Sequence, residues 1–114
     1  MNSVQKTSLD ALVRNQLEAA RATTSGRAAR TVYGGHEHVL RQTLIALLAG
    51  RSLAEHDSPG EATLHVLSGR VRLVTSTDSW DGRSGDLITI PATPHSLEAI
   101  EDAAVLLTVA TRRT

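Results

Sequence analysis

Cysteine is absent from the 114 residues, and aromatic side chains are nearly absent, with one Trp, one Tyr and no Phe. The lack of cysteine excludes disulfides, thiolate metal sites and cysteine nucleophiles. The scarcity of aromatic rings leaves little for a flat cofactor or an unpaired base to stack on, which disfavours flavin, haem and single-stranded nucleic acid. The interior must therefore be built from Leu, Val, Ile and Ala.

An excess of charge and a long apolar run are also lacking. Twelve basic residues balance twelve acidic ones, whereas a nucleic-acid-binding chain usually carries a basic excess. The longest apolar run, residues 44–49, is too short to span a bilayer, and no apolar stretch follows Lys6 as a secretory signal would require. We therefore expect a cytoplasmic protein that binds neither nucleic acid nor membrane. Interspersed acidic residues favour a solvated face for the N-terminal arginines, which are Arg14, Arg21, Arg27 and Arg30.

Residues 8–23 have the features of one amphipathic helix. Ser8 is placed to cap its N-terminus, and Asp10 in the first turn complements the helix dipole. The apolar stripe along one side of this helix must pack either on the protein's own sheet or on a partner subunit. Its apolar residues recur at spacings of three to four and are Leu9, Leu12, Val13 and Leu17.

From Arg30 onward, short β-rich stretches alternate with turn residues at intervals of about ten, which is typical of an all-β sandwich or barrel. Ser68-Gly69 between two apolar runs predicts a tight hairpin, and Asp81-Gly82 is interpreted as a turn. The chain is thus divided into an N-terminal tail and helix, residues 1–30, and a β-barrel domain, residues 31–114. The predicted strands lie near residues 39–48, 53–57, 62–67, 70–75, 86–90, 95–99 and 103–110.

Two segments resemble the two motifs of the cupin superfamily, whose members are small jelly-roll barrels. In the first motif, Gly50 is followed by five residues and then His56, and a glycine closes the motif thirteen positions later. In the second, Gly85 is followed by five residues and a proline in the segment GDLITIPATPHSL, which contains His95. The resemblance covers roughly residues 40 to 110. It implies an all-β, cupin-type jelly-roll barrel with one N-terminal amphipathic helix.

The resemblance also implies a site, which in cupins is a metal held by two histidines and a glutamate of the first motif and one histidine of the second. His56 and His95 match one histidine of each motif. Ser58 stands at the position of the other histidine, and Ala62 stands at that of the glutamate. Two of the four ligands are therefore present, whereas a catalytic zinc or iron site normally has at least three protein ligands.

Two nearby residues are candidates to complete a site at His56 and His95. Glu61 would reach the interior if a bulge reset the register of its strand, since a one-residue slip turns a side chain to the opposite face. Ser58 is a poor metal ligand unless it is deprotonated, but it offers a polar group to a pocket. The predicted ligand-binding residues are therefore His56, Ser58 and His95. No cofactor is certain, and a divalent Fe, Zn, Mn or Ni ion would be held by His56, His95 and Glu61.

Three further histidines have less defined roles. His36 and His38 precede the first predicted barrel strand and share one face if the chain is extended. They either cover a barrel mouth or belong to a surface loop, and we favour the loop. His65 alternates with Leu64 and Val66, which places it on the outer face of the barrel.

The function that the residues favour is binding of a small molecule in the barrel, with apolar strands as walls and His56, Ser58 and His95 as polar groups. The alternative is a metal-dependent cupin enzyme of the dioxygenase or isomerase type, in which His56 or His95 acts as a general base. Whether the protein is an enzyme stays open at this point, because a fold alone does not define a reaction.

A third hypothesis is a structural role. We expect a homodimer formed through the helix and the outer sheet, which is compatible with either of the other functions. A purely structural barrel would have an interior so full that no ligand could enter. The residues expected to fill it are Leu44, Leu64, Val66, Ile88 and Ile90.

Overall fold

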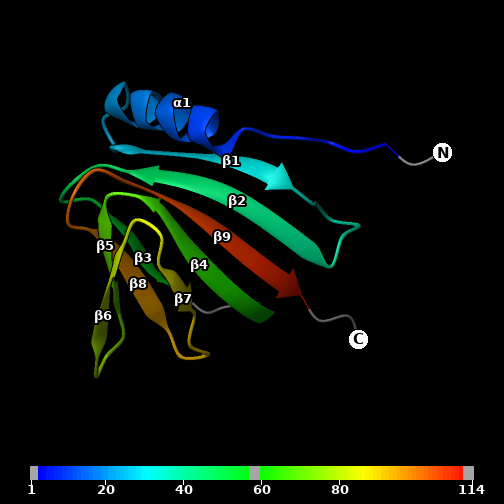
Figure 1. Ribbon diagram of the computed structural model, residues 1–114. Helices are drawn as coiled ribbons and strands as arrows, with labels where there is room; N and C mark the ends of the chain where they lie inside the picture. Colours follow the sequence, from blue (N-terminus) through cyan, green and yellow to red (C-terminus); the bar gives the residue numbers. More distant parts are fainter. Residues whose placement is uncertain (1–2, 57–59, 112–114) are drawn as a thin grey trace.

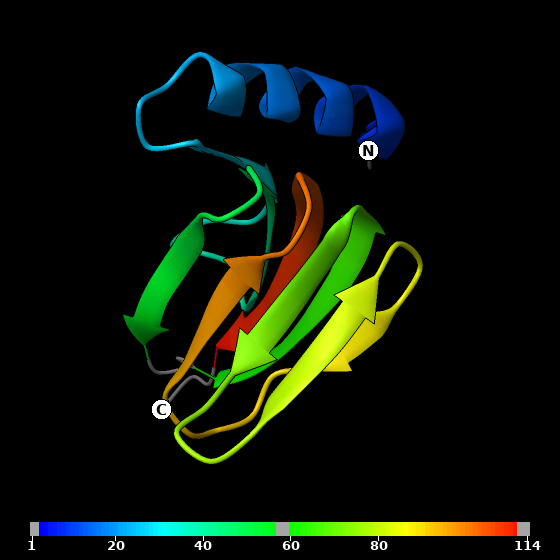
Figure 2. The same ribbon diagram turned by 90° about the vertical axis from the view of Figure 1, so that its left-hand side faces the viewer.

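Two antiparallel sheets face each other in the computed structural model of the protein (Figure 1 and Figure 2). It describes residues 3–56 and 60–111, with positions 55 and 56 described by their backbone alone. The five-stranded sheet has the order β1-β2-β9-β4-β7, and the four-stranded sheet has the order β3-β8-β5-β6. The strands are β1 (Arg27–Tyr33), β2 (Leu40–Leu47), β3 (Ser52–His56), β4 (Gly60–Ser68), β5 (Arg70–Val74), β6 (Ser79–Arg83), β7 (Leu87–Thr89), β8 (His95–Ala99) and β9 (Ala103–Thr111).

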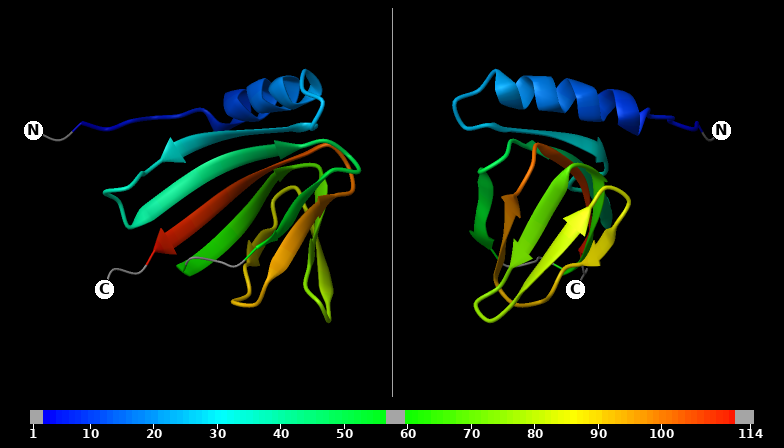
Figure 3. Two further views of the ribbon diagram at one scale, coloured as in Figure 1. Left: turned by 180° about the vertical axis from the view of Figure 1, so that it is seen from behind. Right: turned by 60° about the vertical axis from the view of Figure 1, so that its left-hand side comes forward.

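The predicted amphipathic helix is present as α1 (Leu9–Arg21) and lies over the outer face of the five-stranded sheet (Figure 3). Ser8 caps it, because its hydroxyl oxygen accepts a hydrogen bond from the Ala11 backbone N–H at 3.2 Å. The apolar stripe therefore packs on the protein's own sheet. Within the described part of the chain, no helix is long and apolar enough to cross a membrane. Leu12 of the stripe belongs to a buried cluster with Leu44, Ala104 and Leu106.

The main core lies between the two sheets. Side chains alternate along each strand, so neighbouring residues belong to different clusters. Ile45 contributes to the core between the sheets, whereas Leu44 contributes to the cluster beneath α1. The prediction that Leu44 fills the barrel is therefore wrong. The buried residues of the main core are Ile45, Leu64, Val66, Val71, Leu73, Leu97, Ala103 and Val105, with Ile88 and Ile90 packed against them.

Two strands were not predicted. β1 begins at Arg27, inside the segment assigned to the tail and helix, and most of its residues are exposed, so no alternation marks it in the sequence. β6 contains the Asp81-Gly82 pair that was interpreted as a turn, and that interpretation is wrong. Gly82 lies within β6 and packs closely against the core. A Cβ at this position would lie only 2.7 Å from Cδ1 of Ile88 and 3.1 Å from Val66. The glycine thus allows close packing rather than a turn.

The hairpin predicted at Ser68-Gly69 is wrong, because the two strands that meet there do not pair with each other: β4 pairs with β7 and β9, and β5 pairs with β6 and β8. A tight turn is nevertheless present. Gly69 is the single residue between β4 and β5 and has a φ of 77°. A Cβ at this position would lie 2.1 Å from the backbone oxygen of Asp102. Both the positive φ and the close approach therefore require glycine. This one-residue turn carries the chain from the five-stranded sheet to the four-stranded sheet.

Candidate functional site

Among the described residues, His95 is the one buried polar or charged side chain, at 4% exposure. It begins β8, whose alternate residues are buried. Its Nδ1 lies 2.9 Å from the backbone oxygen of Thr93. A carbonyl oxygen only accepts hydrogen bonds, so Nδ1 carries the proton and donates. In the neutral ring, Nε2 then holds the lone pair that accepts a hydrogen bond or binds a metal.

The backbone brings the two motif histidines together. β3 and β8 are antiparallel neighbours, and the Cα of His56 is paired directly with that of His95 after a register shift that begins at Leu53. Two positions far apart in the sequence thus meet where β3 ends and β8 begins. Ser58, the third residue predicted to bind a ligand, lies outside the described residues.

A small, mostly apolar cavity adjoins His95. Its volume is about 30 Å³, enough for about one or two water molecules. His95 supplies the polar side chain of its lining. The aliphatic residues that surround it come from both sheets and are Ile45, Leu53, Leu64, Leu73, Ile90, Leu97 and Leu107.

Glu61 does not lie with His95. The pairing of β4 with β9 is regular from Gly60 to Val66, so no bulge resets the register in that stretch. Leu64 belongs to the core between the sheets. Glu61, three positions earlier, therefore lies on the opposite face of the strand, and it is exposed. The structure thus gives Glu61 no place in a site built on His95.

The other histidines are also outside the barrel. His36 and His38 lie exposed in the segment between β1 and β2, as a surface loop predicts. The ring of His38 packs edge-on against Tyr33, with centroids 5.3 Å apart and planes at 71°. His65 is paired with Leu106 of β9. Since Leu106 belongs to the cluster beneath α1, His65 lies on the outer face.

A metal site is not evident in the part of the chain that the structure describes. No group of three or more His, Cys, Asp or Glu side chains comes together among those residues. Among the side chains that the structure describes, the lining of the cavity beside His95 is otherwise aliphatic. These residues do not fit a three-ligand metal site, because aliphatic side chains supply no donor atoms.

No protein-family model matches the chain, and no curated protein matches it significantly. Among solved structures, it is similar to the conserved SPY1581 protein of unknown function from Streptococcus pyogenes, with 28% identity and a TM-score of 0.71 over 81% of this chain and 80% of that one. It is also similar to a cupin superfamily protein (DSY2733) from Desulfitobacterium hafniense, with 15% identity and a TM-score of 0.69 over 75% of this chain and 78% of that one. An RmlC-like cupin protein from Desulfovibrio desulfuricans has 25% identity and a TM-score of 0.65 over 74% of this chain and 81% of that one.

The two facing sheets and these similarities show that the protein is a small cupin-fold protein, as its two motifs predict. Within that fold, sequence reasoning missed the backbone oxygen of Thr93, which fixes the ring of His95. The type of the residue at this position gave no signal of the contact, because the contact is made by the backbone. Because one fold hosts many functions, the function has to be argued from the site itself.

Proposed function

We propose that the protein binds a small molecule at the end of the barrel where His95 lies. The observation that carries this proposal is a buried imidazole, held by the Thr93 carbonyl, in the wall of a cavity whose other described lining residues are aliphatic. The hydrogen bond to Thr93 offsets the free-energy cost of burying this imidazole, so the apolar wall can carry a polar group. Small-molecule sites commonly have this composition.

The ligand expected here has a compact apolar body and one polar group that lies against the imidazole of His95. The present cavity holds only about two waters, so a larger ligand must displace side chains. Leu53 and Ile90 are the candidates to move, because both are only partly buried and line the cavity. A weak metal site at His56 and His95, and with it a metal-dependent enzyme, stays a prediction that elemental analysis tests.

The experiment is a binding screen followed by NMR. Compact acids, alcohols and phenols are added to isotope-labelled protein, and the imidazole signals of His95 are monitored. We expect hits to shift those signals and to lose their binding in the His56→Ala/His95→Ala variant, while its circular dichroism stays native. The His65→Ala variant is the matched control and should bind normally. Unchanged binding by the double variant would place the site elsewhere.

Metal content is measured on the same protein, purified without a tag or chelator. About one equivalent of a transition metal, lost in the His56→Ala/His95→Ala variant, would replace the metal-free binding proposal with the metal-dependent alternative. No retained metal after incubation and desalting would support the metal-free pocket.

A further inference from the structure

The outer edge of β1 has no neighbouring strand, because β1 ends the five-stranded sheet. Among the described residues, β1 pairs with β2 and accepts one further hydrogen bond, from the Thr23 hydroxyl to the Arg27 oxygen at 3.4 Å. The strand has seven residues and no proline, and its pairing with β2 is regular from Arg27 to Thr31. An open edge of this kind is a template for another extended chain.

Exposed arginines lie on β1 and near its two ends. They are Arg27, Arg30, Arg41 and Arg51. None of these four arginines forms an ion pair within residues 3–56 and 60–111. Arg51 packs at the start of β1, where a Cβ on Gly26 would lie 2.8 Å from its Cγ. Arg41 belongs to β2 and lies beside the turn that follows β1, where a Cβ on Gly34 would lie 2.9 Å from its Cα. Arg27 and Arg30 therefore give the edge strand itself a positive charge, and Arg51 adds to it at the start of β1.

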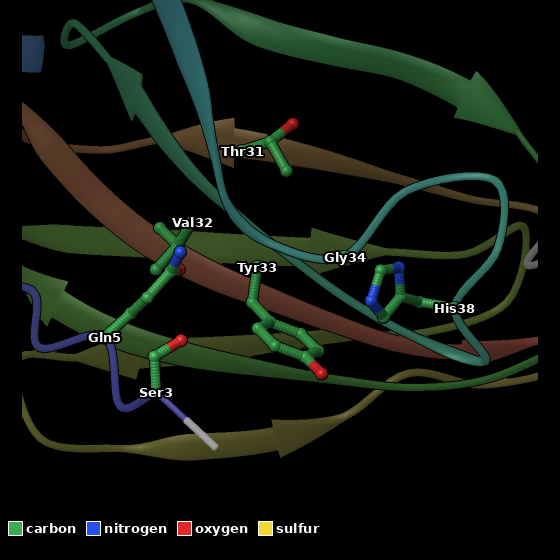
Figure 4. A pocket seen from close by; sticks show the side chains of 7 residues that line it. All are labelled: Ser3, Gln5, Thr31, Val32, Tyr33, Gly34 and His38. Carbon is green, nitrogen blue, oxygen red and sulfur yellow. The ribbon is translucent and has the colours of Figure 1, made fainter. Parts of the chain in front are cut away.

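A surface pocket of about 460 Å³ opens beside the end of β1. Figure 4 shows that Ser3 and Gln5 of the N-terminal segment form one side of it. Tyr33 and His38, whose rings are in edge contact, form another side. Its volume is within the range of ordinary ligand pockets, so it can accept a side chain of a bound peptide.

We propose that the edge of β1 binds an acidic, extended peptide segment of a partner protein, which adds to the sheet as a further strand. Main-chain hydrogen bonds to β1 would supply affinity, and side-chain contacts would supply specificity. Arg27 and Arg30 are three positions apart and so lie on opposite faces of the sheet. A peptide with carboxylates at positions i and i+3 therefore matches both arginines, and a neighbouring apolar side chain enters the pocket at Tyr33.

Charge favours this occupant over the alternatives. If β1 paired with β1 of a second copy about a two-fold axis, a register centred on Arg27 or on Arg30 would place that arginine opposite its own copy, and like charges across a strand pair are destabilising. A nucleic acid would use the arginines but not the open backbone edge. An acidic peptide uses both features.

The test uses the capped peptide Val-Glu-Thr-Val-Glu-Leu with the full-length protein. Binding is measured by isothermal calorimetry and by amide shifts of isotope-labelled protein. Two further peptides carry N-methyl groups on the two alternate sets of amides, only one of which can face β1. We expect shifts in residues 27–33, loss of binding for one methylated peptide and normal binding for the other. Replacing both Glu by Gln should weaken binding about tenfold, because each exposed ion pair contributes roughly threefold.

Protein variants complete the test. Arg27→Ala/Arg30→Ala should weaken binding about tenfold, whereas Arg83→Ala, an exposed arginine on β6 without an ion pair among the described residues, should leave it unchanged. The proposal fails if no peptide binds at millimolar concentration, in which case the arginines only keep the edge soluble. It also fails if both methylated peptides bind equally, if a single-stranded oligonucleotide binds more tightly at the same residues, or if dimerisation of the protein buries β1.

Discussion

Replacing Leu73 by Ala tests whether the interior beside His95 can become a ligand-sized cavity. Leu73 is 1% exposed and lines the cavity of about 30 Å³. A Leu→Ala change in a packed core costs about 3–5 kcal/mol, because the lost transfer free energy adds to the cost of the space left behind. The new space joins the existing cavity, so the result is one larger void. For a domain of this size, a loss of about 3 kcal/mol lowers the Tm by roughly 10–15 °C.

Leu44→Ala is the matched control. Leu44 is also fully buried but packs beneath α1 and does not line the cavity. Both variants should lose similar free energy of unfolding in urea titrations. Apolar cavities bind benzene, and benzene at ten times its Kd would restore about 1.4 kcal/mol to Leu73→Ala. Only in that variant should benzene shift the imidazole signals of His95.

Two results would refute the reasoning. A loss below about 1 kcal/mol in Leu73→Ala would mean that the barrel collapses around the missing side chain. Benzene that stabilises Leu73→Ala without moving the His95 signals would mean that the void opens elsewhere. Either result would remove the structural basis for a ligand site between the two sheets.

Two further predictions concern the surface charges and the turns. Hydrogen bonds from the Arg72 guanidinium and a second arginine lower the pKa of Asp81 from 3.8 to about 2. Because the pKa of Asp81 is lower in the folded state than in the unfolded state, ionised Asp81 stabilises the fold above about pH 4, and this stabilisation is lost as the pH falls toward about 2. Urea unfolding should show that loss of stability in the wild type but not in Asp81→Asn. Gly50→Ala, at φ 83° in open space, should cost about 1–2 kcal/mol, and Gly69→Ala should cost more because its Cβ would lie 2.1 Å from a backbone oxygen; equal costs in thermal unfolding would contradict this.

Local features of the sequence were sufficient for the helix and for most strands. Ser8 and the apolar stripe predict α1 to within two residues at its C-terminus, because capping and periodicity act within one or two turns. The Ser68-Gly69 pair likewise predicts a tight turn, although the strands that it joins belong to different sheets and form no hairpin. β1 and β6 were missed because their residues do not alternate: β1 is mostly exposed, and Gly82 packs inside β6 where a turn was expected.

The order and spacing of the two motifs also placed His95 in the barrel, and the structure confirms that it is buried there. The partner of its ring could not be predicted in the same way. The hydrogen bond to Thr93 depends on how the loop before β8 turns back on itself, and no residue type signals that geometry.

The sequence by itself therefore determined the helix, the barrel and the segment that carries His95. Only the tertiary structure decided that Glu61 and Leu44 lie outside the main core, that the cavity at His95 is small, and that arginines gather at the edge of β1. The physical reason is that periodicity shows which side chains share a face. Whether that face meets the other sheet, the helix or solvent depends on the pairing of strands that are distant in the chain.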